Sequence, residues 1–251
     1  MKPSTLLWCA AMLAACSSFT APTPAEATRL AEARRLLEER PREALEITDE
    51  LLAQNPNLRE ARLVAAEGGL CLARMGGKMT ELLLQDSVQN FERALEGVEE
   101  NAEPRAFLML AECQFDLGEF EKGSEAASQA AAGFAALKTA AGNRQASQAT
   151  LLAARCDMRS FVAVRDAERK AGKPDAHGNV PAEPYTSELA SRAMNRFASV
   201  QAEFPGESIT QIAAIHQWLD QGAAGIQELE RGLRQAPQES AIHDAYIAWM
   251  V

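Results

Sequence analysis

One spaced pattern returns five times along this chain: a small residue, a larger residue four positions later, and an apolar or small residue seven positions after the first. Offsets of four and seven place three side chains on one face of an α-helix. A short helical unit of this kind cannot bury its apolar face alone, so neighbouring units are expected to stack into a solenoid. The copies are Ala44-Thr48-Leu51, Ser87-Phe91-Ala94, Gly123-Ala127-Ala130, Ala193-Phe197-Val200 and Gly225-Leu229-Gly232.

Proline marks the end of three of these copies at the same distance. Pro56, Pro205 and Pro237 each follow the small residue by twelve positions. Proline ends a helix because it lacks the N–H donor and its ring clashes with the preceding turn. An irregular bundle of alanine-rich helices is the alternative interpretation, but it does not explain the shared offset.

The composition indicates an all-α chain and excludes some partners. Of 251 residues, 47% are hydrophobic and 6% aromatic, and long stretches show no strand-like alternation. The net charge of −10 argues against nucleic acid, whose phosphates require a basic face. The sequence also shows no polybasic run for anionic lipid.

The first residues are typical of an export signal. Met1-Lys2 precedes an apolar run from Leu6 to Ala15, which is too short for a bilayer-spanning helix but right for a secretory signal. Its end, Leu13-Ala14-Ala15-Cys16, resembles a bacterial lipoprotein signal, in which the cysteine is lipidated and becomes the first mature residue. An ordinary signal peptide cut nearby is the alternative. The domain prediction is a signal peptide over 1–15 and a flexible tether over 16–24.

The clearest helix–turn–helix unit runs from Pro104 to about Lys138. Its first helix carries Phe107, Leu110 and Ala111, a Gly118 turn follows, and the second helix carries the small residues of the third copy. This segment resembles the tetratricopeptide repeat (TPR), although Gln114 and Gly123 depart from it. The resemblance implies a right-handed superhelical solenoid of about five repeats over 25–251, closed by a C-terminal helix from Glu239.

Two units depart from the regular spacing. In the second unit nine extra residues lie around Met75-Gly76-Gly77-Lys78, which predicts a loop or a lengthened turn. In the fourth unit twenty-eight extra residues separate the two helices, and we place an insertion at about 165–184. Its centre, Gly172 to Pro181, is polar and rich in proline and glycine, which predicts a loop of functional or disordered character.

We find no motif that predicts catalysis, a metal or a cofactor. The three histidines form no HExxH motif, and no nucleophile elbow or phosphate-binding glycine loop is present. His177 beside Asp175 falls short of a metal site, and His216 is expected in the core. The remaining cysteines, Cys71, Cys113 and Cys156, are expected to be small buried residues.

The TPR resemblance implies that outward-facing residues of the first helices contact protein partners in a groove. Phe115 and Trp218 are the predicted apolar anchors, since aromatic residues dominate interface hot spots, although packing between units is the alternative role. Glu67, Glu112 and Asp116 favour a basic or neutral partner. The predicted groove residues are Leu63, Glu67, Leu70, Arg105, Leu108, Glu112, Phe115, Asp116, Thr210, Gln217 and Trp218.

Together these features predict a periplasm-facing lipoprotein, anchored through Cys16, that scaffolds or assembles other envelope proteins without catalysis. Ser17 lacks the aspartate that retains enteric lipoproteins in the inner membrane, so we expect the outer membrane. Barrel-assembly lipoproteins and secretin pilotins are precedents for such a role. The alternative function is a glycan- or solute-binding accessory protein for cell-wall enzymes.

Overall fold

The computed structural model describes residues 19–99, 102–172 and 178–250, and within these ranges all regular structure is helical. The predicted all-α solenoid class is confirmed. The helices are α2 (Pro24–Leu36), α3 (Pro41–Gln54), α4 (Arg59–Arg74), α5 (Thr80–Leu95), α6 (Pro104–Asp116), α7 (Phe120–Ala136), α8 (Ala140–Ala171), α9 (Pro184–Val200), α10 (Pro205–Trp218), α11 (Gly222–Gln235) and α12 (Ser240–Met250).

The chain divides into two compact units, Met1–Glu96 and Gly97–Val251. In the first unit α2 pairs with α3 and α4 pairs with α5, while α3 packs on α4. The two first helices of these pairs, α2 and α4, also touch each other. Leu30, Leu51, Leu58 and Val64 belong to the apolar cluster that holds this unit together.

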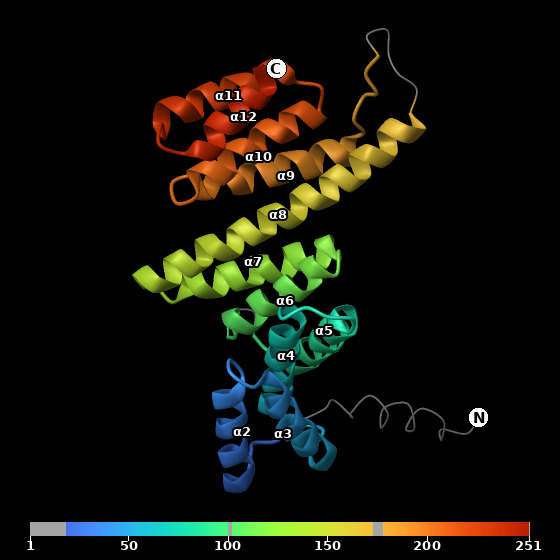
Figure 1. The fold of residues 1–251 in the computed structure, drawn as a ribbon, viewed down its shortest axis with the longest axis vertical. Helices are drawn as coiled ribbons and strands as arrows, with labels where there is room; N and C mark the ends of the chain where they lie inside the picture. The colour runs from blue at the N-terminus through green and yellow to red at the C-terminus, as the bar shows by residue number, and fades with distance from the viewer. Residues whose placement is uncertain (1–18, 100–101, 173–177, 251) are drawn as a thin grey trace, which may run out of the picture. The chain divides into compact units, whose positions relative to one another are not determined.

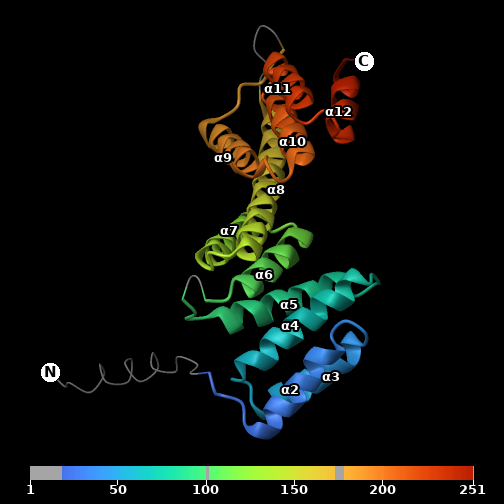
Figure 2. The ribbon, with the colours of Figure 1, turned by 90° about the vertical axis from the view of Figure 1, so that its left-hand side faces the viewer.

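The second unit repeats the same scheme over three helix pairs and a closing helix. Each helix packs on the next from α6 to α11, and α12 packs on both α10 and α11, as Figures 1 and 2 show. The first helices again touch in order, α6 with α8, α8 with α10, and α10 with α12. This contact between first helices is what places their outward side chains on a shared face.

The fivefold pattern marks the second helix of every pair. Its copies lie on α3, α5, α7, α9 and α11, and every residue of the pattern is buried. Ala44, Phe91, Ala127 and Phe197, for example, have no exposed surface. The small members let the partner helix approach closely, and the larger members fill the space between pairs.

The extra residues of the second repeat form a turn and lengthen the two helices on either side of it. Helices α4 and α5 have 16 residues each, and the turn between them contains Gly76 and Gly77. Both glycines have positive φ, at 78° and 139°, which side chains with a Cβ rarely adopt. The predicted loop around Met75–Lys78 therefore lies where the sequence places it.

The segment at 165–184, predicted as an insertion, begins within a helix. Helix α8 continues to Ala171 and has 32 residues, so residues 165–171 are helical and Arg165 is buried. Residues 178–183 then lead without regular structure into α9. The extra length is taken up largely by a longer first helix, and His177 and Asp175 lie outside the described residues (Figure 1).

The predicted flexible tether over 16–24 is wrong in its second part. The backbone N–H of Thr20 donates a hydrogen bond to the carbonyl of Asn57 at 3.1 Å. Thr23 caps α2 through a reciprocal hydrogen-bonded box with Glu26, and Pro24 is already helical. Residues 20–24 are thus part of the first unit, whereas Cys16 lies outside the described residues.

Candidate interaction groove

A pocket of about 440 Å³ opens on the first-helix face of the second unit. Its apolar lining consists of Phe115 from α6, Met158 and Val162 from α8, and Phe197 from α9. Met158 and Phe197 are buried, and Phe115 is half-buried with its ring centroid 5.6 Å from that of Phe120 in an edge-to-face arrangement. We name this feature the Phe115 pocket. Three stacked pairs contribute to it, so its walls are fixed by the core.

The rim of the Phe115 pocket carries two arginines and one carboxylate. Arg155 binds Glu207 through two hydrogen bonds of 2.5 and 2.6 Å, which raise the pKa of Arg155. Arg159 lies one helical turn further along α8 and is exposed, so it supplies the excess positive charge of the rim. Glu67, Glu112 and Asp116, which the sequence predicts as the acidic groove residues, do not line this pocket.

The two predicted aromatic anchors have different roles. Phe115 lines the pocket, as an anchor should. Trp218, at the end of α10, packs against the core cluster of α8 to α10. The guanidinium of Arg169 stacks over its ring at 4.9 Å, and its carbonyl accepts hydrogen bonds from two arginines of α8. Trp218 thus fills the packing role that was the alternative.

Leu70 was predicted to face the groove, and that prediction is wrong. It is fully buried, because α4 is covered by α2, α3 and α5 together. Leu63, Glu67, Leu108, Glu112 and Thr210 are half-buried, and Arg105, Asp116 and Gln217 are exposed. Of the predicted partner-binding set, Phe115 is the residue that lines the pocket.

Sequence reasoning missed the contribution of α8 to this pocket. Arg155, Met158, Arg159 and Val162 follow one another at helical spacing, which was a readable signal of one face. The fourth unit was assigned a first helix around Leu152 and Cys156, and the remaining length was assigned to an insertion. Because α8 has 32 residues, its pocket-lining residues extend beyond the first helix that a regular repeat would have.

Behind the pocket, α8 carries a buried carboxylate. Asp157 has no exposed surface, and its Oδ1 accepts a 2.7 Å hydrogen bond from Ser124. Its Oδ2 lies 3.1 Å from Nε of Arg192 and 2.9 Å from Nη1 of Arg196. Burial lowers the pKa of Arg196, and the nearby carboxylate opposes that effect. This ion cluster joins α7, α8 and α9.

The thiol beside this cluster is inert. Burial, and secondarily the charge of Asp157, raises the pKa of Cys156 to about 12. Cys156 is therefore protonated at neutral pH and is a packing residue rather than a nucleophile. Cys113 is also buried and Cys71 is half-buried, and all three remain thiols.

A second buried charge closes the far end of α8. Arg165 is 1% exposed, and its guanidinium donates to the carbonyls of Trp218 and Val180 and to Asp220, the last at 2.9 Å. Arg169 donates to the other oxygen of Asp220 at 2.6 Å. These bonds fasten the loop after α8 and the α10–α11 turn to the helix.

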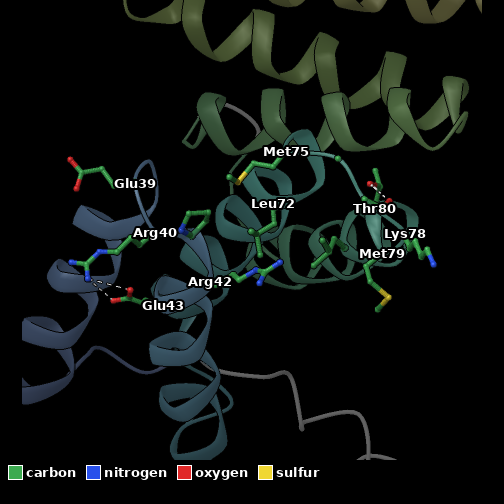
Figure 3. A pocket seen from close by; sticks show the side chains of 13 residues that line it. Glu39, Arg40, Arg42, Glu43, Leu72, Met75, Lys78, Met79 and Thr80 are labelled. Carbon is green, nitrogen blue, oxygen red and sulfur yellow. Dashed lines mark hydrogen bonds and ion pairs between the residues drawn. The ribbon is translucent and has the colours of Figure 1, made fainter.

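A larger pocket, of about 740 Å³, lies in the first unit between the α2–α3 turn and the α4–α5 turn (Figure 3). Met75 and Met79 on its wall are 73% and 56% exposed. In Figure 3 the side chain of Arg42 extends from α3 toward Leu72, whereas that of Glu39 points away. Because turn residues form much of this wall, the pocket is less firmly held than the Phe115 pocket.

The described histidines are engaged within the chain. His216 is half-buried with Nδ1 2.9 Å from the side-chain oxygen of Gln221, and Nε2 of His243 lies 2.9 Å from the carbonyl of Pro237. Within the described ranges no three His, Cys, Asp or Glu side chains gather as metal ligands would. None of the described helices has both the length and the apolarity that crossing a bilayer requires.

Comparison with known proteins supports the fold and reaches no further. No family model matches the sequence, and no curated protein matches it. The crystal structure of MamA superposes with a TM-score of 0.52 over 82% of this chain and 95% of MamA, at 12% sequence identity. The structure of the assembly chaperone of RpL4 (Acl4, residues 1–338) covers 90% of this chain and 95% of its own, at 13% identity and a TM-score of 0.42. At this identity, the likeness to MamA shows the TPR-type helical solenoid fold alone.

Proposed function

We propose that this chain is a lipid-anchored, non-catalytic scaffold of the bacterial cell envelope, which holds a segment of a partner protein in the Phe115 pocket. The observation that carries this proposal is the pocket itself. Helices α6, α8 and α9 present an apolar floor, and α8 and α10 supply a charged rim, which is the composition of a protein-binding site. The rim favours a segment that places a large apolar side chain on Phe115 beside a neutral or acidic residue.

The envelope location rests on the sequence. Leu13-Ala14-Ala15-Cys16 follows an apolar run of secretory length, and lipidation of Cys16 would attach the chain to a membrane facing the periplasm. The outer membrane, and a complex for barrel assembly or for a secretin or pilus, are the specific setting we propose. Replacing Cys16 with alanine is expected to move the protein from the membrane to the soluble fraction. Unchanged fractionation would contradict the anchor.

Partner capture can be tested with a photoreactive amino acid in place of Gln211, which lines the pocket from α10, in the full-length protein. Irradiation of intact cells followed by mass spectrometry is expected to identify a discrete envelope protein. Arg159→Glu should lower partner capture about three- to tenfold, because a rim charge affects association more than folding. Arg144→Glu is the matched control, since Arg144 is also exposed on α8 but lies outside the pocket lining.

Equal capture by the Arg159→Glu and Arg144→Glu variants would show that the Phe115 pocket is not the binding site. Crosslinks to cell-wall glycan in place of protein would favour the accessory role for cell-wall enzymes.

A further inference from the structure

The segment just before α2 is hydrogen-bonded to the rest of the first unit. Besides the backbone bond from Thr20 to Asn57, the side-chain amide of Asn55 donates to the Thr20 hydroxyl at 2.9 Å. The same amide donates to Glu26 at 3.3 Å, next to the cap of α2. These bonds therefore hold Phe19, the residue before Thr20, beside the start of α4.

Phe19 lines a small pocket of about 190 Å³ together with Asn57, Arg62, Arg93 and Glu96. We name it the Phe19 pocket. Its charged residues are two arginines and one glutamate, so it is locally basic on a chain whose net charge is −10. The sequence showed no basic run because α4 and α5 supply one arginine each from distant positions.

The two arginines in the Phe19 pocket are close enough to repel each other. Burial lowers the pKa of Arg62, and the charge of Arg93 lowers it further, while the charge of Glu96 opposes both effects. Arg62 is held in place by a 2.6 Å bond to the carbonyl of Pro56 and a 3.2 Å bond to Asn90. An anion between the guanidinium groups would relieve this repulsion, and phosphate matches guanidinium geometry well.

We propose that the Phe19 pocket is the membrane-facing site of the first unit, where Arg62 and Arg93 bind the phosphates of lipid headgroups. This inference rests on the proposed lipid anchor at Cys16. It assigns the anchor a second role, which is to fix how the first unit meets the membrane.

The sequence distance to the anchor supports this orientation. Two residues, Ser17 and Ser18, separate Cys16 from Phe19, and three residue steps span at most about 10 Å. The headgroup layer of one leaflet is itself roughly 5–8 Å thick. A lipid on Cys16 would therefore hold Phe19 at the headgroup layer. Because the anchor makes the effective concentration of lipid very high, a weakly basic pocket is sufficient.

The test uses the full, lipidated protein in vesicles of phosphatidylcholine and phosphatidylglycerol. A photoreactive amino acid replaces either Glu96, in the Phe19 pocket, or Lys78, beyond the other end of α4. These sites lie at opposite ends of a helix of 16 residues, about 24 Å long at 1.5 Å per residue. The yield of phospholipid adducts is expected to be about fivefold or more higher at position 96.

Two further variants make the result specific. Arg93→Glu should reduce the yield at position 96 without releasing the protein from the vesicles. A flexible Gly/Ser insertion of about ten residues between Ser18 and Phe19 should bring the two yields together, since it lengthens the link and leaves Thr20 docked.

The possible failures are distinguishable. Equal yields at positions 96 and 78 in a protein that carries the lipid mass would overturn the orientation and leave the anchor intact. Absence of the lipid mass on Cys16 would overturn both proposals. Protein adducts in place of phospholipid at position 96 in native membranes would overturn the membrane role and identify a protein site.

Discussion

In the first unit, Asp49 on α3 is exposed at the surface but lies near Asp86 on α5, and partial desolvation together with that second negative charge raises the pKa of Asp49. In the second unit, Asp157 is buried far more deeply, yet it meets Ser124, Arg192 and Arg196. A buried carboxylate is costly only where its hydrogen bonds and counter-charge are missing. The irregular fourth pair, with its long α8, thus adds buried ion pairs to its apolar core, whereas the ion pairs Arg29–Glu50 and Arg34–Glu60 of the first unit lie at its surface.

Two turns of the second unit have the same hydrogen-bond pattern but differ in whether an ion pair supports them. In the α6–α7 turn Glu119 N–H donates to the carbonyl of Gln114, and in the α10–α11 turn Gln221 N–H donates to that of His216, both at 2.8 Å. Both turns need a left-handed residue at their centre. The first uses Gly118 with φ of 79°, whereas the second uses Asp220 with φ of 61°. Asp220 accepts the strain because its carboxylate binds Arg165 and Arg169.

The largest expected effect comes from Asp157→Ala. Removal of this carboxylate leaves Arg196 without its buried counter-charge and should cost about 3–5 kcal/mol of unfolding free energy. Asp166→Ala, on the same helix but in a surface pair with Lys170, should cost less than about 0.5 kcal/mol. Urea unfolding measures both, and hydrogen exchange should show the loss in α7 to α9 and not in α2 to α5. Similar losses for the two variants would show that the Asp157 cluster stabilises the fold no more than a surface ion pair does.

The Asp220→Gly variant separates the effect of backbone strain in the α10–α11 turn from the effect of the ion pairs that Asp220 makes. Glycine relieves the left-handed strain but removes the acceptor for Arg165 and Arg169, so a net loss of about 1–2 kcal/mol is expected. Hydrogen exchange should accelerate at 178–183 and 219–221. Gly118→Ala, which adds strain to the turn without an ion pair, should lose about 1 kcal/mol. A more stable Asp220→Gly protein would show that the carboxylate does not fasten this end of α8.

The smallest expected effect is a gain from Asp49→Asn. The pKa of Asp49 is raised in the folded state above its ordinary value of 3.8, so ionisation of this group opposes folding at neutral pH. The variant should melt slightly higher than the native protein at about pH 7, and the difference should disappear as pH falls to about 3, where the carboxyl is protonated in both states. A lower melting temperature at neutral pH would mean that Asp49 is stabilised by its surroundings.

Much of the fold could be predicted from the sequence, because it depends on the spacing of small and apolar residues within single helices. The residues of the repeated pattern are all buried on second helices, and the Gly118 turn lies where expected. The groove was harder to predict. Leu70 and Trp218 lie on first helices at plausible outward positions, but which side of a first helix faces outward depends on how its neighbours cover it.

The sequence by itself determined the helical pairs and the buried face of each second helix, because these follow from spacing within one helix. Tertiary structure alone decided that the first part of the expected insertion is helical, that Asp157 and Arg165 are buried beside opposite charges, and that Arg62 and Arg93 share one pocket with Phe19. Each of these depends on contacts between residues far apart in the chain. Helical periodicity fixes which face of a helix is apolar, but the partner of a buried charge is fixed only by packing.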